Sequence, residues 1–291
     1  MSVRPRCWGV YRELAHSPGR ETDDALILRA TAAALEDRGF DVALRSAEEL
    51  PERPDDAEAA SVPPFLFVMC ERSGVVERLA AWQRRGVRIV NRPDAIRNTD
   101  RERTIERFAR HGISFPRSVL VETARADTPD VPAFPIWIKR GDVHATQAGD
   151  VSRADGPDEL SARLGRLAAR GISRAVLQEH APGDLIKFYG VAGENDVELS
   201  WFEWFYHRDQ KLENHRFDRD ALRALVGRAA AALGLEVFGG DAIAGPDNRL
   251  VLIDLNAWPS FALYRDVAAP RIAEALAVRF RREVREVGVS R

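Results

Sequence analysis

The sequence predicts an α/β protein with a parallel sheet in its N-terminal part and β-hairpins towards its C-terminus. Three observations predict this class. Short apolar segments alternate with helical segments over the first 95 residues, as in parallel sheets covered by helices. Residues 64–70, PFLFVMC, form the continuous apolar run that is typical of a strand buried on both faces. Two later pairs of apolar segments are each joined by a short polar turn.

The first 95 residues predict a small α/β unit. Its first helix should begin at Thr22, because threonine caps helix N-termini, and should end before Gly39, because glycine favours the conformation that follows a helix. The polar, proline-containing segment 51–61 should be a surface loop. The expected strands are 7–11, 40–45, 64–70 and 87–91, and the expected helices are 23–38 and 74–86.

The remaining residues predict further strands and helices. Gly112 should close one helix, and a proline at the start of another suits the first helical turn. The expected helices are 98–112, 156–171, 218–234 and 266–283. The expected strands are 113–121, 134–140 and 174–180, a hairpin over 185–206 with its turn at GEND, and a strand pair over 235–256 joined through GPDN.

Composition excludes several classes of protein. The 291 residues include 43 basic and 45 acidic ones, and this net charge of -2 does not favour a nucleic-acid partner. The two cysteines, Cys7 and Cys70, lie in no zinc-binding pattern. No run approaches the roughly 20 apolar residues of a membrane helix, and the first residues lack the apolar stretch of a signal peptide. We therefore expect a cytoplasmic protein without membrane contacts. The sequence leaves open whether it forms a homodimer.

The segment LVLIDLNAWPSF, residues 250–261, places polar side chains on an apolar strand. Asp254 and Asn256 are two residues apart, so both lie on one face of the strand. Pairing across the predicted turn brings Asp241 within reach. Carboxylate and amide oxygens are ligands that Mg²⁺ prefers. The alternative, which also stays open, is a strand that leaves the core through an ordinary turn.

Two other segments carry polar groups at strand ends. Lys139 ends the apolar strand PIWIK, where a lysine must either reach solvent or meet an anion such as a phosphate. The strand AVLQEH is followed by APGD, which would expose backbone donors and acceptors to a flat heterocycle or would simply join a strand to a loop.

The order of five segments carries more information than any one of them. They are TDRERTIERFARHGISFP, FPIWIKRGD, VLQEHAPGDLIKFYGVAG, GLEVFGGDAIAG and LVLIDLNAWPSF. Over roughly residues 95–270 this succession resembles the ATP-grasp superfamily, in particular its RimK-like (glutamate-ligase) branch, with some similarity to inositol trisphosphate kinases. The resemblance implies an ATP-grasp fold. Its parts would be an N-terminal α/β domain (1–95), a central α+β lid domain (96–180) and a C-terminal domain (181–291), with ATP between the last two.

The resemblance also implies a role for particular residues. Those expected to bind ATP are Arg101 and Lys139 at the phosphates, Gln178, Glu179, His180 and Ala181 at the adenine, and Asp184 at the ribose. Those expected to hold Mg²⁺, or Mn²⁺, are Asp241, Asp254 and Asn256. Those expected to act on the substrates are Lys187, Arg265 and His144. The loop 207–215 is a further candidate to cover the acceptor.

The implied reaction is ATP-dependent ligation of a small acid, amino acid or peptide to an amine through an acyl phosphate, with release of ADP. The sequence departs from the family where a glycine-rich lid is usual, because RGDVHATQAGDV stands at residues 140–151. The kinase branch also carries a histidine in this loop, which His144 resembles. Asp254 stands where most ligases have a glutamate. A small-molecule kinase and a nucleotide-binding scaffold with a degenerate site therefore stay open as alternatives.

Overall fold

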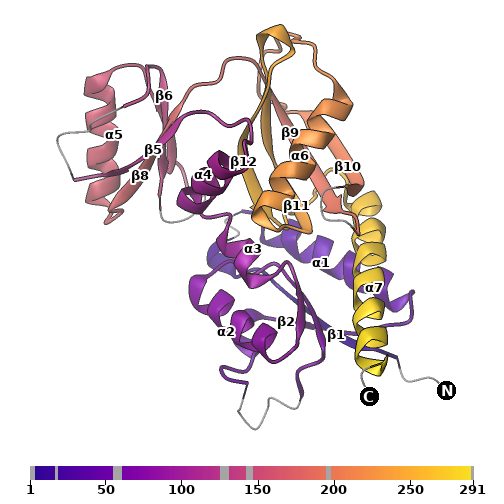
Figure 1. The fold of residues 1–291 in the computed structure, drawn as a ribbon. Coiled ribbons are helices and arrows are strands. Elements are labelled where there is room, and N and C mark those ends of the chain that lie inside the picture. The colour runs from indigo at the N-terminus through magenta and orange to yellow at the C-terminus, as the bar shows by residue number, and fades with distance from the viewer. Residues whose placement is uncertain are drawn as a thin grey trace.

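The structure, a computed structural model, describes residues 4–16, 19–54, 61–124, 131–141, 147–194 and 198–289. These residues form three four-stranded sheets that follow one another along the chain (Figure 1). The first sheet is parallel, and the other two are antiparallel. The predicted α/β class is thereby confirmed. Within the described part of the chain, no helix is long and apolar enough to cross a membrane.

The N-terminal sheet has the strand order β2-β1-β3-β4. Its strands are β1 (Arg6–Val10), β2 (Asp41–Arg45), β3 (Phe65–Val68) and β4 (Arg88–Val90). Its helices are α1 (Glu21–Glu36) and α2 (Ser73–Arg84), with short 3₁₀ turns η1 (Leu14–His16) and η2 (Ala47–Glu49). All four residues of β3 are buried, as the apolar run predicted.

The middle sheet has the order β5-β8-β6-β7 and is preceded by two helices. The strands are β5 (Ser118–Glu122), β6 (Ile136–Arg140), β7 (Val151–Ala154) and β8 (Arg174–Glu179). The helices are α3 (Pro93–Arg97), α4 (Arg101–Arg110) and, packed on the sheet, α5 (Pro157–Ala169).

The C-terminal sheet has the order β10-β9-β11-β12. The strands are β9 (Asp184–Ala192), β10 (Leu199–Tyr206), β11 (Val237–Ala244) and β12 (Leu250–Ala257), with the 3₁₀ turn η4 (Pro246–Asn248) between the last two. The helices are α6 (Arg219–Leu233) and α7 (Arg265–Val289). Asp218 caps α6 by accepting hydrogen bonds from two backbone N–H groups, and Gly234 ends it at a φ of 77°.

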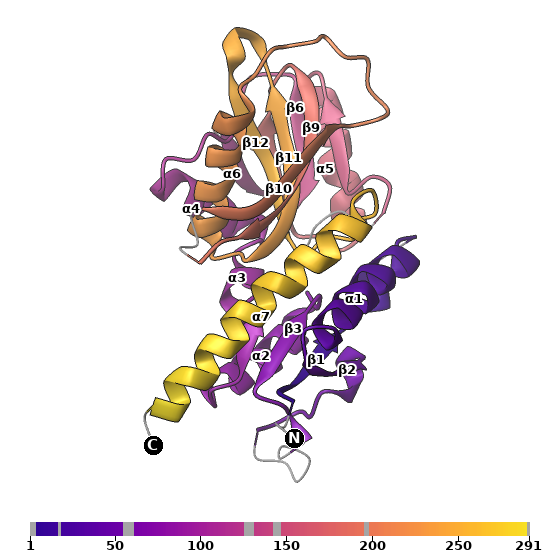
Figure 2. The same ribbon diagram turned by 90° about the vertical axis from the view of Figure 1, so that its right-hand side faces the viewer.

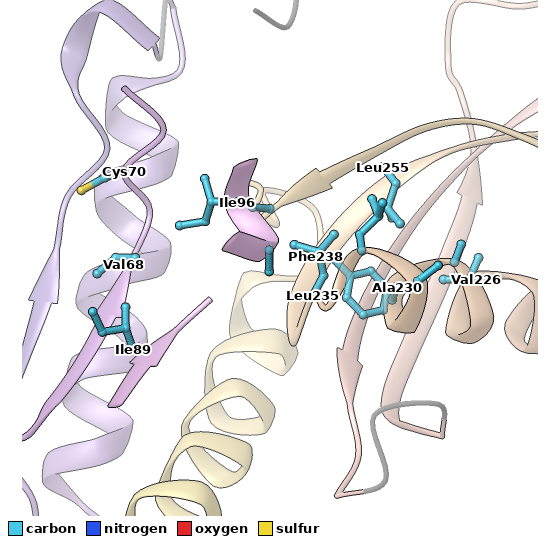
Figure 3. Close-up of a cluster of buried hydrophobic side chains, with 14 of the residues drawn as sticks. Val68, Cys70, Ile89, Ile96, Val226, Ala230, Leu235, Phe238 and Leu255 are labelled. Carbon is cyan, nitrogen blue, oxygen red and sulfur yellow. The ribbon is translucent and has the colours of Figure 1, made fainter. Parts of the chain in front are cut away.

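The first and third sheets share their hydrophobic cores, whereas the middle sheet has one of its own. Figure 3 shows Val68 and Ile89 of the first sheet in one cluster with Phe238 and Leu255 of the third. A second cluster joins α1, the first sheet and α7, which crosses from the C-terminal sheet to the N-terminal one (Figure 2). The third cluster contains residues of the middle sheet and α5. The first and third sheets thus form one packed body that carries the middle sheet.

A few sequence-based expectations about the elements are wrong. Thr22 is not the N-cap, because α1 already begins at Glu21. The helix expected over 98–112 is shorter, because α4 spans Arg101–Arg110. The separate helix α3 before it was not predicted. Strand β7 was not predicted, because its residues VSRA alternate weakly and show little apolar character. The domain boundaries proposed from the resemblance stay a prediction.

Asn91 is a buried connection between the first and third sheets. It is fully buried, its Oδ1 accepts hydrogen bonds from the N–H groups of Glu236 (2.7 Å) and Val237 (2.9 Å), and its Nδ2 donates to the Val237 carbonyl (2.7 Å). Beside it, the Glu236 carboxylate pairs with Arg88 (2.7 Å) and Arg279 (2.5 Å). Three chain segments therefore meet at the start of β11.

Replacing Asn91 by alanine should destabilise the protein by about 3 kcal/mol, because two buried N–H groups lose their acceptor and the Val237 carbonyl keeps only the Trp258 N–H as a donor. Chemical denaturation would measure the change in the free energy of unfolding. The matched control is Asn248→Gly, an exposed asparagine in a turn at a φ of 56° that glycine adopts easily. A loss below about 1 kcal/mol in Asn91→Ala would contradict the role of this connection.

Candidate nucleotide and metal site

One large cavity, of about 1130 Å³, is lined by residues of the N-terminal unit and of the middle and C-terminal sheets. The middle sheet contributes Lys139 and Gln178, the C-terminal sheet contributes most of the floor, and the N-terminal unit contributes residues that follow β1. A volume of this size is at the upper end of small-molecule sites. It is large enough to hold a nucleotide together with a second molecule.

The floor of the cavity is one face of the C-terminal sheet, and strand pairing explains its composition. Asp241 of β11 lies directly opposite Asp254 of β12 on one side and opposite Lys187 of β9 on the other. Directly opposed residues point to the same face, and so do residues two apart on a strand. Asp241, Asp254 and Asn256 therefore share one face with Lys187, and all four line the cavity.

A β-bulge lies at the centre of this arrangement. The register of β11 and β12 shifts after Asp241, so Ile253 is an extra residue of β12 without a partner opposite it. The Ile253 carbonyl accepts a hydrogen bond from Lys139 Nζ at 3.1 Å. The bulge thus joins the C-terminal sheet to the lysine of the middle sheet across the cavity.

The charges at the floor are strongly coupled. Lys187 Nζ donates to Asp241 Oδ1 at 2.8 Å, and Asn256 Nδ2 donates to Asp254 Oδ2 at 3.1 Å. Burial raises the pKa of Asp241, Lys187 opposes that shift, and Asp254 adds to it. Burial lowers the pKa of Lys139, with Asp254 opposing and Arg101 adding to the change. A bound anion at Lys139 and a bound cation at Asp241 would each relieve a cost of burial.

Two glycines allow this close packing. A Cβ atom at Gly240 would lie 2.3 Å from the Asp254 carbonyl oxygen, on the face that packs into the core. A Cβ atom at Gly239 would lie 2.7 Å from Pro259 and 2.8 Å from the Tyr189 ring, on the cavity face. The pair GG before Asp241 is therefore required by close approach of β12 and of the segment after it.

The donor set fits a hard divalent cation. It consists of two carboxylates and one amide oxygen, because Asn256 uses its nitrogen towards Asp254 and keeps its oxygen for another partner. Among the described residues, no group of three or more His, Cys, Asp or Glu side chains is placed to hold a metal. Remaining coordination positions would fall to phosphate oxygens and water, which is usual for Mg²⁺.

Arg12 of the N-terminal unit holds the segment that follows β12. Its guanidinium, 7% exposed, contacts Glu71 and lies 3.0 Å from Asp24. Its Nη2 donates to the Trp258 carbonyl at 2.6 Å. Burial opposes the charge of Arg12, but the carboxylates of Glu71 and Asp24 outweigh it and raise its pKa. Trp258 itself is fully buried, as expected of a core residue.

The segment expected at the adenine lies along the cavity wall. Gln178, Glu179, His180 and Ala181 all line the cavity. The Glu179 N–H already donates to the Arg117 carbonyl, and the His180 N–H donates to that of Pro135. Arg101, the first residue of α4, also lines the cavity and donates to the Arg140 carbonyl at the end of β6.

Asp184 does not occupy the place expected of a ribose ligand. Its side chain is buried, and its two carboxylate oxygens accept hydrogen bonds from the N–H groups of Glu213 (2.6 Å) and His215 (2.8 Å). It fixes the loop between β10 and α6, whose residues His207 and Arg208 line the cavity. The ribose role of Asp184 stays a prediction, and the residue type at a strand start does not reveal such backbone partners.

Arg265, expected to act on the substrates, pairs with a carboxylate of α1. Arg265 Nη2 donates to Asp23 Oδ1 of α1 at 2.8 Å, and Arg265 is not among the residues that line the cavity. His144 lies outside the described residues. Sequence reasoning missed Trp137, although its separation of two residues from Lys139 signals a shared strand face. It also missed Arg12, for which no local signal exists.

No protein-family model matches the sequence, and no curated protein matches it either. Solved structures match its shape. A D-alanine–D-alanine ligase from Bacillus anthracis complexed with ATP is 13% identical, with a TM-score of 0.72 over 97% of this chain and 99% of that chain. A RimK-domain ATP-grasp protein from Sphaerobacter thermophilus is 18% identical, with a TM-score of 0.66 over 94% and 99%.

A third match is the ATP-grasp ligase PsnB complexed with a minimal precursor, 17% identical, with a TM-score of 0.64 over 95% of this chain and 99% of that one. These matches extend over nearly the whole length of both chains, so they describe the arrangement of all three sheets. The protein has the ATP-grasp fold.

Proposed function

We propose that the protein is an ATP-dependent ligase that joins a carboxylate to an amine and releases ADP. The observation that carries this proposal is the convergence of Lys139, Lys187, Asp241, Asp254 and Asn256 on one cavity. Cations for phosphate and oxygens for a divalent metal are the parts that phosphoryl transfer needs, since the protein has little covalent chemistry to perform.

The residues would divide the work by position. Lys139 and Arg101 would bind phosphate oxygens at the wall formed by the middle sheet. Lys187 would meet the γ-phosphate or the substrate acid, because it lies beside Asp241 on the cavity floor. A Mg²⁺ or Mn²⁺ ion held by Asp241, Asp254 and Asn256 would neutralise phosphate charge during the reaction.

The proposed reaction has two steps. An oxygen of the substrate carboxylate attacks the γ-phosphorus, the bond from that phosphorus to the bridging oxygen breaks, and ADP leaves. The amine nitrogen then attacks the acyl carbon of the acyl phosphate, phosphate leaves, and the nitrogen loses a proton. Prearranged cations would favour the first step, because negative charge moves between fixed phosphate positions.

The matched proteins support this class of reaction. The B. anthracis protein is a D-alanine–D-alanine ligase complexed with ATP, and PsnB was solved with a minimal precursor, Mg and ADP. PsnB was also solved with its precursor peptide PsnA2 and AMPPNP. The substrates proposed here are accordingly an acid and an amine, either free or carried by a peptide.

Product analysis should distinguish a ligase from a kinase of the same fold. With ATP, magnesium and a panel of amino acids and small acids, we expect ADP release that depends on an acid. Added hydroxylamine should trap the acyl phosphate as a hydroxamate, which a colour reaction with iron detects. A phosphorylated alcohol with no hydroxamate would indicate the kinase alternative, and binding of Mg·ATP without any ADP release would indicate the scaffold.

Asp254→Asn should lower turnover at least about 100-fold, because an amide supplies one neutral oxygen where the carboxylate supplies a charge to the cation. Steady-state ADP release measures this loss, and circular dichroism checks the fold. The control is Asp247→Asn, an exposed residue in the turn at the other end of β12 with a φ of 57°, which asparagine tolerates. Near-normal turnover in Asp254→Asn would show that Asp254 is not a metal ligand.

Lys139→Met should separate activity from stability. Burial already disfavours the lysine's charge, so an apolar side chain of similar length should change the melting temperature little, because the relieved cost of burial offsets the lost bond to the Ile253 carbonyl. Turnover should fall at least about 100-fold, because the phosphates lose a cation. Thermal unfolding and ADP release measure the two effects. A large drop in melting temperature with little loss of turnover would show that Lys139 has a structural role only.

A further inference from the structure

The cavity floor changes from charged to aromatic between β11 and β10. Phe205 of β10 lies directly opposite Lys187 of β9, which in turn lies directly opposite Asp241 of β11. Directly opposed residues share one face of a sheet, so Phe205 faces the cavity that Lys187 and Asp241 line. Tyr189, two residues from Lys187 on β9, lies on the same face and lines the cavity too. Two aromatic rings therefore cover the floor beside the charged groups.

Core packing does not account for Phe205. The other aromatic residues of β10 belong to the hydrophobic cores: Trp201 and Phe202 are buried in them, and Trp204 and Tyr206 pack against one of them. None of the three clusters that the described residues form includes Phe205, which is only partly buried. Its ring is thus left with apolar surface in a cavity, where a ligand can cover it.

Neighbouring rings hold the aromatic floor in place. The ring centroid of Phe205 is 5.7 Å from that of Tyr189 and 5.8 Å from that of Tyr264. Tyr189 also lies across Gly239 of β11, where a Cβ atom would be 2.8 Å from its ring. Burial raises the pKa of Tyr189 to about 12, so its hydroxyl stays protonated at neutral pH. The surface is therefore fixed by packing and uncharged.

The direction in which Lys187 points sets the place of this surface relative to the reaction. Its Nζ donates to Asp241 Oδ1 at 2.8 Å, on the side of β9 that pairs with β11. Phe205 lies on the other side of β9, about 4.8 Å from it in strand spacing. A carboxylate that meets the Lys187 ammonium group therefore has Phe205 and Tyr189 as the adjoining floor.

A substrate with a second carboxylate is the competing class. Arg20 and Arg208 line the cavity, and both are exposed. Exposed cations contribute little to the binding of an anion, because water screens them. The face of an aromatic ring is negative and disfavours a carboxylate, whereas it pairs well with the edge or the offset face of another ring. The floor beside Lys187 thus suits an aromatic group better than an acidic one.

We propose that the acid which this protein activates carries an aromatic group, and that this group packs on Phe205 and Tyr189 while the carboxylate meets Lys187. The inference rests on the proposed function, in which Lys187 meets the substrate acid. Leu263, 48% exposed, lines the cavity next to Tyr264 and gives the aromatic group an apolar edge. Phe205 and Tyr189 determine specificity and take no part in either chemical step.

The test compares acids in the full-length protein with ATP, magnesium and hydroxylamine as the amine, so that the natural amine is not needed. Phenylacetate, butyrate and glutarate represent an aromatic, an aliphatic and a dicarboxylic acid. The kcat/KM for ADP release should favour phenylacetate over each of the others about 10-fold or more, as burial of a phenyl ring predicts. Equal or higher values for butyrate or glutarate would overturn the aromatic class.

Phe205→Ala should separate recognition of the aromatic group from catalysis. It should lower kcat/KM for phenylacetate about 10-fold, mainly through KM, and change that for butyrate less than about 3-fold. Tyr189→Phe keeps the ring and should keep the preference. Trp204→Phe is the control, because Trp204 packs against Tyr206 and Phe217 and does not line the cavity. Equal losses for both acids in Phe205→Ala, or none, would overturn the assignment.

Calorimetry gives a measure that does not depend on turnover. With magnesium and a non-hydrolysable ATP analogue, phenylacetate should bind the wild type about 10-fold more tightly than it binds Phe205→Ala. Equal affinities would contradict the stacked position. A wild type that releases no ADP with any acid would overturn the proposed function and this inference together. Hydroxamate formation that prefers butyrate or glutarate would overturn the inference and leave the proposed function standing.

Discussion

The pairing of β11 with β12 is the constraint on which the site depends. It places Asp241 opposite Asp254, and its bulge presents the Ile253 carbonyl to Lys139. Gly240 makes the pairing sterically acceptable, because any side chain there would meet the backbone of Asp254. If the register shifted by one residue, every polar side chain on the cavity face would turn into the core. Chemistry and packing are therefore set by the same backbone register.

The distribution of hydrophobic cores explains which walls of the cavity are firmly connected. The N-terminal and C-terminal sheets share two cores and the buried Asn91 connection, so their contributions to the cavity keep a fixed relation. The middle sheet has its own core and reaches the floor through few polar bonds, including that of Lys139. Lys139 thus belongs to a wall that has its own core and that bonds to the floor through the Ile253 carbonyl.

Much of the fold could be predicted from the sequence, and so could the floor of the site. Alternating apolar segments predicted the parallel sheet, and the ATP-grasp fold expected from the resemblance is confirmed by the solved structures. Strand alternation placed Asp254 and Asn256 on one face. Asp184 and Arg265 were assigned differently, because their partners, two backbone N–H groups and Asp23, lie far away in sequence. Strand β7 escaped prediction because its four residues VSRA lack apolar alternation.

The position of α7 has a consequence for biosynthesis. Phe280 stacks on Phe65 of β3 with ring centroids 4.6 Å apart, and Ile272 and Leu276 lie in the same cluster. The first sheet therefore gains part of its apolar cover from α7, which the ribosome adds long after β3. Until those residues emerge, the nascent N-terminal unit exposes this surface to chaperones and to other chains. Synthesis of α7, rather than of the first ninety residues, is the point at which this apolar surface can become buried.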